Sequence, residues 1–120
     1  MIQLNTCLIS FDNSGIRVVR CIRFLNKNKK LGSFLIVSVK SIRSKNIKLK
    51  IKKGSILIAC LLKKTTTHVK FSGLKLVTTI NGVVILNKQF QPISSRIIGV
   101  LAREIKLGGL KKISLSGVVI

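Results

Sequence analysis

Short runs of β-branched and other apolar residues, separated by turn formers, recur along most of this 120-residue chain. Runs of this length that are bounded by Gly, Asn, Asp and Ser are typical of strands. The candidate strands are Thr6–Phe11, Ile16–Leu25, Phe34–Lys40, Ile56–Leu62, Lys75–Thr79 and Val83–Asn87. Five or six strands in so small a domain favour a closed β-barrel, because closure removes exposed strand edges.

Turn residues stand at several of the junctions. Asp12-Asn13-Ser14-Gly15 has turn chemistry at every position, and Gly15 can adopt a positive φ. Asn81-Gly82 is a strong hairpin signal, which predicts that the strands on either side of it pair with each other. Lys63–Gly73, which contains His68, is predicted to be a polar loop. Pro92 fixes its own φ and should end a strand or loop.

Two basic segments carry a more specific prediction. Ile47–Lys52 alternates strictly, so a strand would place Ile47, Leu49 and Ile51 on the interior face. Lys48, Lys50 and Lys52 would then form a cationic row with a spacing of about 6.6–6.8 Å. In the run from residue 16 to 25, Arg20 would share a face with apolar side chains, which a β-bulge or an arginine that reaches RNA from the barrel rim would resolve.

The C-terminal third changes its periodicity. Apolar residues at Ile97, Ile98, Leu101 and Ile105 follow the 3.6-residue period, which predicts a short amphipathic helix or turn, and Leu110–Ile120 forms an apolar tail. Two interpretations remain open for this segment. It is a helix packed on the β-domain, or a docking element in which Arg96 and Arg103 contact RNA or protein and Glu104 is a structural counter-charge.

Charge narrows the class of partner. Lys and Arg number 23 against two acidic residues, which gives a net charge of +21. Self-repulsion on this scale predicts a polyanionic partner, with nucleic acid as the first candidate and an anionic membrane as the second. The longest apolar run, Ile56–Leu62, is far shorter than the ~20 residues of a spanning helix. The candidate RNA-binding residues are Arg17, Arg20, Arg23, Lys40, Arg43, Lys45, Lys48, Lys50, Lys52, Lys53, Lys63 and Lys64.

Catalysis and metal binding have little support in the sequence. Cys7, Cys21 and Cys60 are widely spaced in apolar surroundings, so we expect buried, reduced thiols and no metal site. Asp12 and Glu104 have no acid–base companion nearby in the sequence, and no phosphate-binding glycine motif occurs, so we expect neither an enzyme nor a cofactor. Five Phe and no Trp or Tyr make a weak platform for base stacking.

Segments along the whole chain resemble the universal ribosomal large-subunit protein L-fourteen family. They are Met1-Ile2-Gln3, Asp12–Arg17, Cys21-Ile22, Ile36–Lys40, Lys52-Lys53-Gly54, Lys63-Lys64, Asn81, Val84–Asn87, Pro92, Ser95-Arg96-Ile97, Gly99, Arg103-Glu104 and Ile113-Ser114-Leu115. The resemblance implies a single domain over residues 1–120, a five-stranded β-barrel followed by a C-terminal loop and one or two short helices. It implies binding to large-subunit rRNA, contacts with proteins of the L-three and L-nineteen families, and a bridge to small-subunit rRNA.

Two function classes follow. The first is a structural ribosomal protein, and the second is a free-standing cationic protein that binds nucleic acid or acts on membranes. The regular turn signals favour the first, since a membrane-binding helix would need a long amphipathic stretch. High Lys and Ile usage, only two alanines and the lack of a basic or Arg-rich leader lead us to expect synthesis inside a mitochondrion, with the plastid as second choice.

Overall fold

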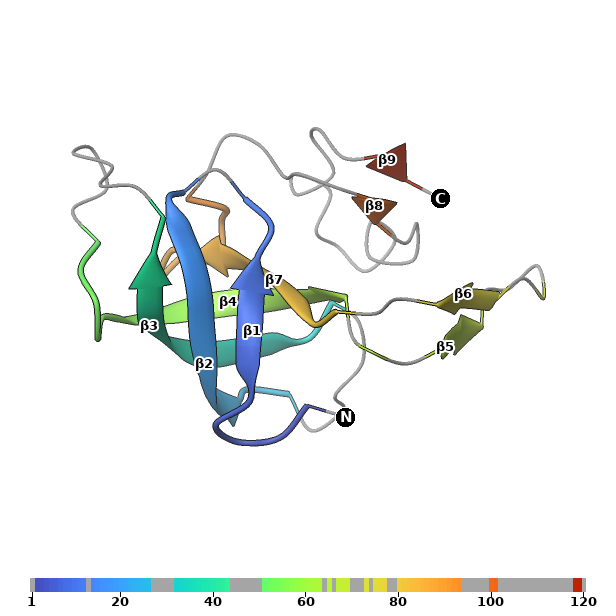
Figure 1. Ribbon diagram of the computed structural model, residues 1–120, viewed down its shortest axis with the longest axis horizontal. Helices are drawn as coiled ribbons and strands as arrows, with labels where there is room; N and C mark the ends of the chain where they lie inside the picture. Colours follow the sequence, from blue (N-terminus) through green and yellow to red (C-terminus); the bar gives the residue numbers. More distant parts are fainter. Residues whose placement is uncertain are drawn as a thin grey trace.

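The computed structural model describes residues 2–12, 14–26, 32–43, 51–63, 65, 67–69, 73, 75–77, 80–93, 100–101 and 118–119. Within these residues the regular structure is all strand, with no helix. Five strands close into a barrel in the order β1–β2–β3–β4–β7 (Figure 1). Their bounds are β1 Cys7–Ser10, β2 Ile16–Phe24, β3 Phe34–Ile42, β4 Ile56–Lys63 and β7 Gly82–Leu86. The predicted mainly β, closed five-stranded barrel is confirmed.

Barrel closure depends on the one parallel pairing among its strands. β1 pairs with β2 and β4 with β7 in antiparallel fashion, whereas β1 and β7 run parallel, with Ile9 opposite Gly82. The amide of Ile9 donates to the carbonyl of Asn81 at 3.1 Å, and the amide of Phe11 donates to the carbonyl of Val83 at 3.0 Å. These bonds join the first strand of the barrel to the last.

The barrel interior is filled by apolar side chains that alternate along the strands. The fully buried members include Leu8, Val19, Cys21, Leu35, Val37, Ala59, Leu61, Val83 and Ile85. Burial of one Val, Leu or Ile side chain stabilises a fold by roughly 1.5–3 kcal/mol, so this cluster is the main source of stability. A continuous apolar run such as Ile56–Leu62 predicts a strand that is buried on both faces. This prediction holds for Ala59–Leu62 but is wrong for Ile56, with 68% of its surface exposed.

Irregularities in β2 resolve the misfit at Arg20. The β2–β3 register shifts between Ile16 and Val18, between Val18 and Val19, and again further along the strand. An extra residue at a shift reverses which face the following side chains occupy. As a result Ile16 and Val19 are both buried while Arg20 is exposed, which agrees with the first of the two predicted explanations, a bulge in this strand.

The predicted hairpin at Asn81-Gly82 is wrong. β6 (Lys75–Val77) pairs with β5 (Thr67–Val69), and β7 pairs instead with β1 and β4. The β5–β6 sheet extends away from the barrel at the right of Figure 1. β5 also occupies part of the segment that was predicted to be a loop around His68.

The physical reason for the missing turn is the bonding of Asn81. Its side-chain oxygen accepts a hydrogen bond from the amide of Thr65 at 2.9 Å, which connects the segment after β4 to the start of β7. Gly82 lies in β7 and does not adopt the positive φ that a type I′ turn requires.

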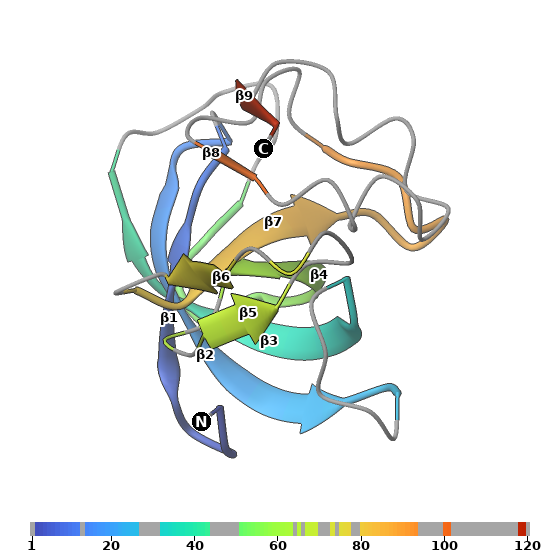
Figure 2. The ribbon, with the colours of Figure 1, turned by 90° about the vertical axis from the view of Figure 1, so that its right-hand side faces the viewer.

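Near the C-terminus, β8 (Val100–Leu101) and β9 (Val118–Val119) pair in parallel, at the top of Figures 1 and 2. The predicted helix over residues 97–105 is therefore wrong at Val100 and Leu101, and its other positions lie outside the described residues. A short apolar run does not distinguish a helix from a strand by periodicity alone.

The alternating segment from Ile47 to Lys52 is described only at its end. Ile51 is half-buried and packs against the barrel core, and Lys52 is exposed. Both agree with the predicted facing, although neither residue is in a strand.

Candidate nucleic-acid interface

The outer side of β2 presents three arginines at intervals of three residues. In a regular strand, residues three apart point to opposite faces, so at least one of Arg17, Arg20 and Arg23 would face the interior. A register shift lies within each interval, and all three side chains are exposed. The irregular strand thus keeps every arginine outside the barrel.

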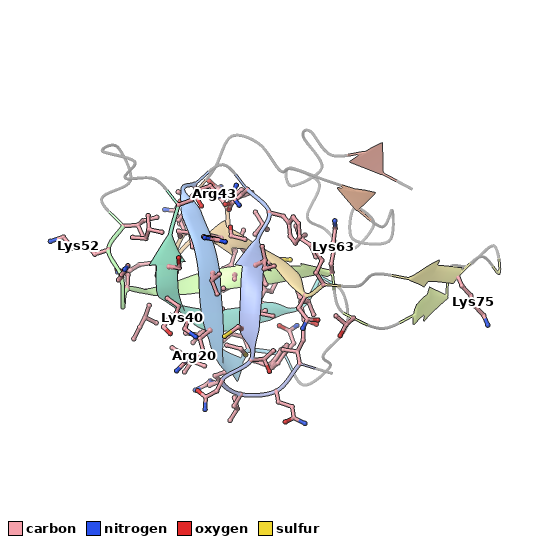
Figure 3. All side chains as sticks on the ribbon, in the orientation of Figure 1. Arg20, Lys40, Arg43, Lys52, Lys63 and Lys75 are labelled. Carbon is pink, nitrogen blue, oxygen red and sulfur yellow. The ribbon has the colours of Figure 1, made fainter. Side chains whose placement is uncertain are left out.

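Lys40 on β3 and the middle arginine of β2, Arg20, both lie next to Cys7. Arg20 is the pairing partner of Cys7 on β1, and the ammonium of Lys40 donates a hydrogen bond to the sulfur of Cys7 at 3.6 Å. The exposed side chains of Arg20 and Lys40 therefore both border Cys7, and Figure 3 shows them in the same part of the barrel surface.

Further basic residues lie where β3 ends and where the chain returns to it. The amide of Arg43 donates to the carbonyl of Gly15 at 2.7 Å, which holds this residue beside the start of β2. Gly54, which follows Lys52 and Lys53, donates its amide to the carbonyl of Val39 at 2.8 Å. We define the cationic face as the seven exposed basic residues on or beside β2 and β3: Arg17, Arg20, Arg23, Lys40, Arg43, Lys52 and Lys53.

No carboxylate among the described residues offsets this charge at the surface. Asp12 is the only acidic residue in the described ranges, and 5% of its surface is exposed. Its carboxylate accepts hydrogen bonds from the Ser10 and Ser14 hydroxyls and from the amide of Ile85. The cationic face is therefore available for an external anion.

Lys63 differs from these residues. It lies half-buried at the end of β4, with its ammonium 4.4 Å from the centre of the Phe11 ring, and Figure 3 places it apart from Arg20, Lys40 and Lys52. Burial lowers the pKa of the Lys63 ammonium. The contact with the ring has the opposite effect, because the ring face attracts a cation.

Several predicted site residues lie outside the described residues, so their placement stays a prediction. They are Asn13, Lys45, Lys48, Lys50, Lys64, Arg96, Arg103 and Glu104. Of the predicted turn residues, Asp12 and Ser14 are buried, Gly15 has a φ of 89°, and Pro92 forms an isolated bridge with Leu86.

The sequence interpretation missed two exposed basic residues, Lys75 on β6 and Lys88 after β7. Their charge was the only signal, since neither belongs to a basic run. It was also wrong about one thiol, because Cys7 is exposed while Cys21 and Cys60 are buried. Cys7 occupies an outward position of β1, whereas burial raises the pKa of Cys60 to about 12.

Two other site types are not found in the described ranges. There, no group of three or more His, Cys, Asp or Glu side chains is close enough to hold a metal ion. That same part of the chain contains no helix long and apolar enough to cross a membrane.

Comparison with known proteins adds to this geometry. A family model described as "Ribosomal protein L14p/L23e" matches residues 1–120. The chain is 37% identical over 122 residues to "Large ribosomal subunit protein uL14" of Carsonella ruddii (strain PV), with both chains covered completely. It is 35% identical over 113 residues to "Large ribosomal subunit protein uL14m" of Acanthamoeba polyphaga, over 88% of this chain and 97% of the relative. Identity to the uL14m of Acanthamoeba castellanii is 36% over 114 residues, which cover 89% and 88% of the two chains.

Proposed function

The chain belongs to the L14p/L23e family of ribosomal proteins, and we propose that it binds large-subunit rRNA through the cationic face. As a member of this family it is a structural constituent of the large ribosomal subunit and not an enzyme. Family membership decides between the two function classes that the sequence left open. We further propose that residues 1–120 act as one domain.

The observation that carries the rRNA proposal is the exposure of all three β2 arginines. A register shift in each interval is needed to keep them outside, and an irregular strand gives up ladder hydrogen bonds. Arginine suits phosphate because its planar group donates two parallel hydrogen bonds. Contacts of this kind fix a folded RNA by its backbone and shape without reading its sequence.

The bridge to the small subunit rests on the C-terminal segment. We propose that Arg96 and Arg103 contact small-subunit rRNA or a neighbouring protein of the L-three or L-nineteen family, with Glu104 as a structural counter-charge. The support is the resemblance of these positions to the family, since they lie outside the described residues. We also propose a mitochondrial location, because two relatives carry the mitochondrial designation uL14m, and the plastid stays the second choice.

The rRNA proposal is tested with two variants that remove the same charge. Arg20→Gln removes a cation from the cationic face, and Lys75→Gln removes one from the β5–β6 sheet. Loss of one phosphate contact reduces the slope of log affinity against log salt by about 1. We expect this reduction for Arg20→Gln, measured by filter binding to transcribed large-subunit rRNA, and a smaller one for Lys75→Gln. Equal slopes for both variants and the unaltered protein would count against the cationic face.

The bridge is tested separately on purified ribosomes. Subunits that carry Arg103→Ala or Glu104→Gln should assemble but join the small subunit less well, as seen by sedimentation. Normal joining by both variants would restrict the segment to a packing role.

A further inference from the structure

We propose that Phe90, in the loop after β7, stacks on an unpaired RNA base whose adjacent phosphate is held by Lys88. This inference rests on the proposed rRNA function and adds a second contact outside the cationic face. The ligand class is a single-stranded nucleotide. The loop, orange in Figure 2, extends beyond the barrel strands at the right-hand edge of that view.

The loop is held rigidly by one side chain and its own backbone. The side-chain oxygen of Asn87 accepts from the amides of Gln89 at 2.9 Å and Gln91 at 3.0 Å. The Asn87 amide donates to the carbonyl of Gln91 at 2.8 Å, and the Phe90 amide donates to the carbonyl of Asn87 at 3.0 Å. Four hydrogen bonds within five residues fix the direction in which position 90 projects.

Phe90 occupies a backbone conformation that its residue type rarely adopts. Its φ is 60°, in the left-handed region that glycine and asparagine favour and bulky residues avoid. Backbone outliers of this kind persist where the surrounding structure enforces them, and they concentrate at functional sites. Glycine would relax this loop, so packing of the backbone does not explain an aromatic residue here.

The Phe90 ring is exposed, and its orientation is set by a contact with Phe34. Phe90 is 44% exposed, and its ring centre lies 5.0 Å from that of Phe34 at an interplanar angle of 66°. An edge-to-face contact uses at most one face of the Phe90 ring, so Phe34 does not cover the other face, on which we propose that the base stacks. Phe34 sets the ring orientation, since it begins β3 and pairs with Cys60 of the barrel wall.

The surroundings fit a nucleotide better than an apolar protein surface. Lys88, Gln89 and Gln91 are all exposed within two residues of Phe90, and Leu25 is the exposed apolar neighbour beside Phe34. A base offers a planar face for stacking, polar edges for amide groups and a phosphate for a cation. Five Phe make a weak platform for several bases, but a site for one base needs only one exposed ring.

The chain has no Trp, so Phe90→Trp introduces a single fluorescent probe at the site. The full-length variant is titrated with single-stranded oligoadenylate, with an RNA duplex of equal length, and with heparin as a polyanion without bases. We expect quenching of the tryptophan by oligoadenylate and little change with duplex or heparin. Equal quenching by all three polyanions would overturn the inference.

A second set of variants measures affinity at a salt concentration that suppresses phosphate contacts. Stacking on one base contributes roughly tenfold or more in affinity. Phe90→Gly and Phe90→Leu should therefore bind oligoadenylate about tenfold more weakly, while Phe90→Trp binds as well as the unaltered protein. Glycine readily adopts the positive φ of position 90, and circular dichroism verifies that Phe90→Gly is folded.

The outcomes separate this inference from the function on which it rests. Unchanged affinity of Phe90→Gly or Phe90→Leu, with RNA binding otherwise intact, overturns the stacking site alone. Failure of the unaltered protein to bind oligoadenylate, with binding to transcribed large-subunit rRNA intact, also overturns the stacking site alone. Failure to bind the transcribed rRNA overturns the rRNA proposal and the stacking site together.

Discussion

The Asp12 side chain extends the parallel ladder between β1 and β7. The amides of Ile9 and Phe11 donate to backbone carbonyls of the β7 segment. At the next position of the ladder, the donor lies on β7 and the acceptor follows β1. There, the Ile85 amide donates to a carboxylate oxygen of Asp12 at 3.0 Å. The other carboxylate oxygen accepts from Ser10 at 2.7 Å and from the amide and hydroxyl of Ser14. One buried carboxylate thus both closes the barrel and holds the β1–β2 turn.

Asp12→Ala should destabilise the protein by about 3 kcal/mol or more, because it leaves the buried Ile85 amide and the serine groups without an acceptor. Chemical denaturation followed by circular dichroism measures this change. Ser14→Ala is the matched control, since it removes one hydroxyl donor from the same carboxylate and should cost about 1 kcal/mol. Similar stability of the two variants would show that Asp12 acts only in the turn.

Sequence reasoning identified Asp12 as a turn residue but not its bond to an amide 73 positions away. Local propensity describes what a side chain does to its own backbone. A long-range acceptor appears only after β1 and β7 are known to be neighbours. The same limit explains Phe90, whose positive φ depends on the bonds of Asn87 within the folded loop.

At the scale of elements, hydrophobic alternation predicted the bulged strand but not the pairing of β7. The misfit of Arg20 was visible because charged and apolar residues fell on one face of the strand. At residues 81–82, the dipeptide is also compatible with a strand start, and only the tertiary contacts of Asn81 distinguish the two arrangements.

Gly82 is required for close packing rather than for a turn. A Cβ atom at this position would collide with the ring of Phe11, which in turn lies under the ammonium of Lys63. Gly82→Ala should therefore cost about 1–3 kcal/mol, typical of overpacking, as measured by thermal or chemical unfolding.

A double-mutant cycle separates this collision from a general backbone effect. In the Phe11→Ala background the ring is absent, so adding Gly82→Ala should cost much less than it does in the unaltered protein. Additive costs of the two substitutions would show that the ring contact is not the reason for glycine at this position.

For the whole molecule, the number of short strands in so small a domain was sufficient to predict a closed barrel, because closure leaves no exposed strand edges. The seven residues of the cationic face, Arg20 and Lys40 included, were all among the candidate RNA-binding residues that the sequence predicted from charge. What could not be predicted is which of these cations lie close together, as Arg20 and Lys40 do on either side of Cys7. Their placement depends on the register shifts in β2 and on the hydrogen bond from the Gly54 amide to the Val39 carbonyl, which brings Lys52 and Lys53 back to β3.

Salt should have opposite effects on the free protein and on its RNA complex. The net charge of +21 opposes compaction, and salt screens this repulsion over a Debye length that falls from about 10 Å at 0.1 M to about 3 Å at 1 M. We therefore expect the unfolding temperature of the free protein to rise with sodium chloride. RNA affinity should fall by about 10³ or more between 50 and 200 mM salt if at least six of the seven basic residues of the cationic face contact phosphates.

Arg20→Gln links the two effects within one molecule. Arg20 and Lys40 both border Cys7, so removing one charge relieves local repulsion and should leave the free protein at least as stable at low salt. The same variant should bind large-subunit rRNA more weakly, and the combination would mark a charge that is kept for binding at the expense of stability. If Arg20→Gln destabilises the free protein and leaves RNA affinity unchanged, the arginine has a structural role, and the cationic face must be redrawn without it.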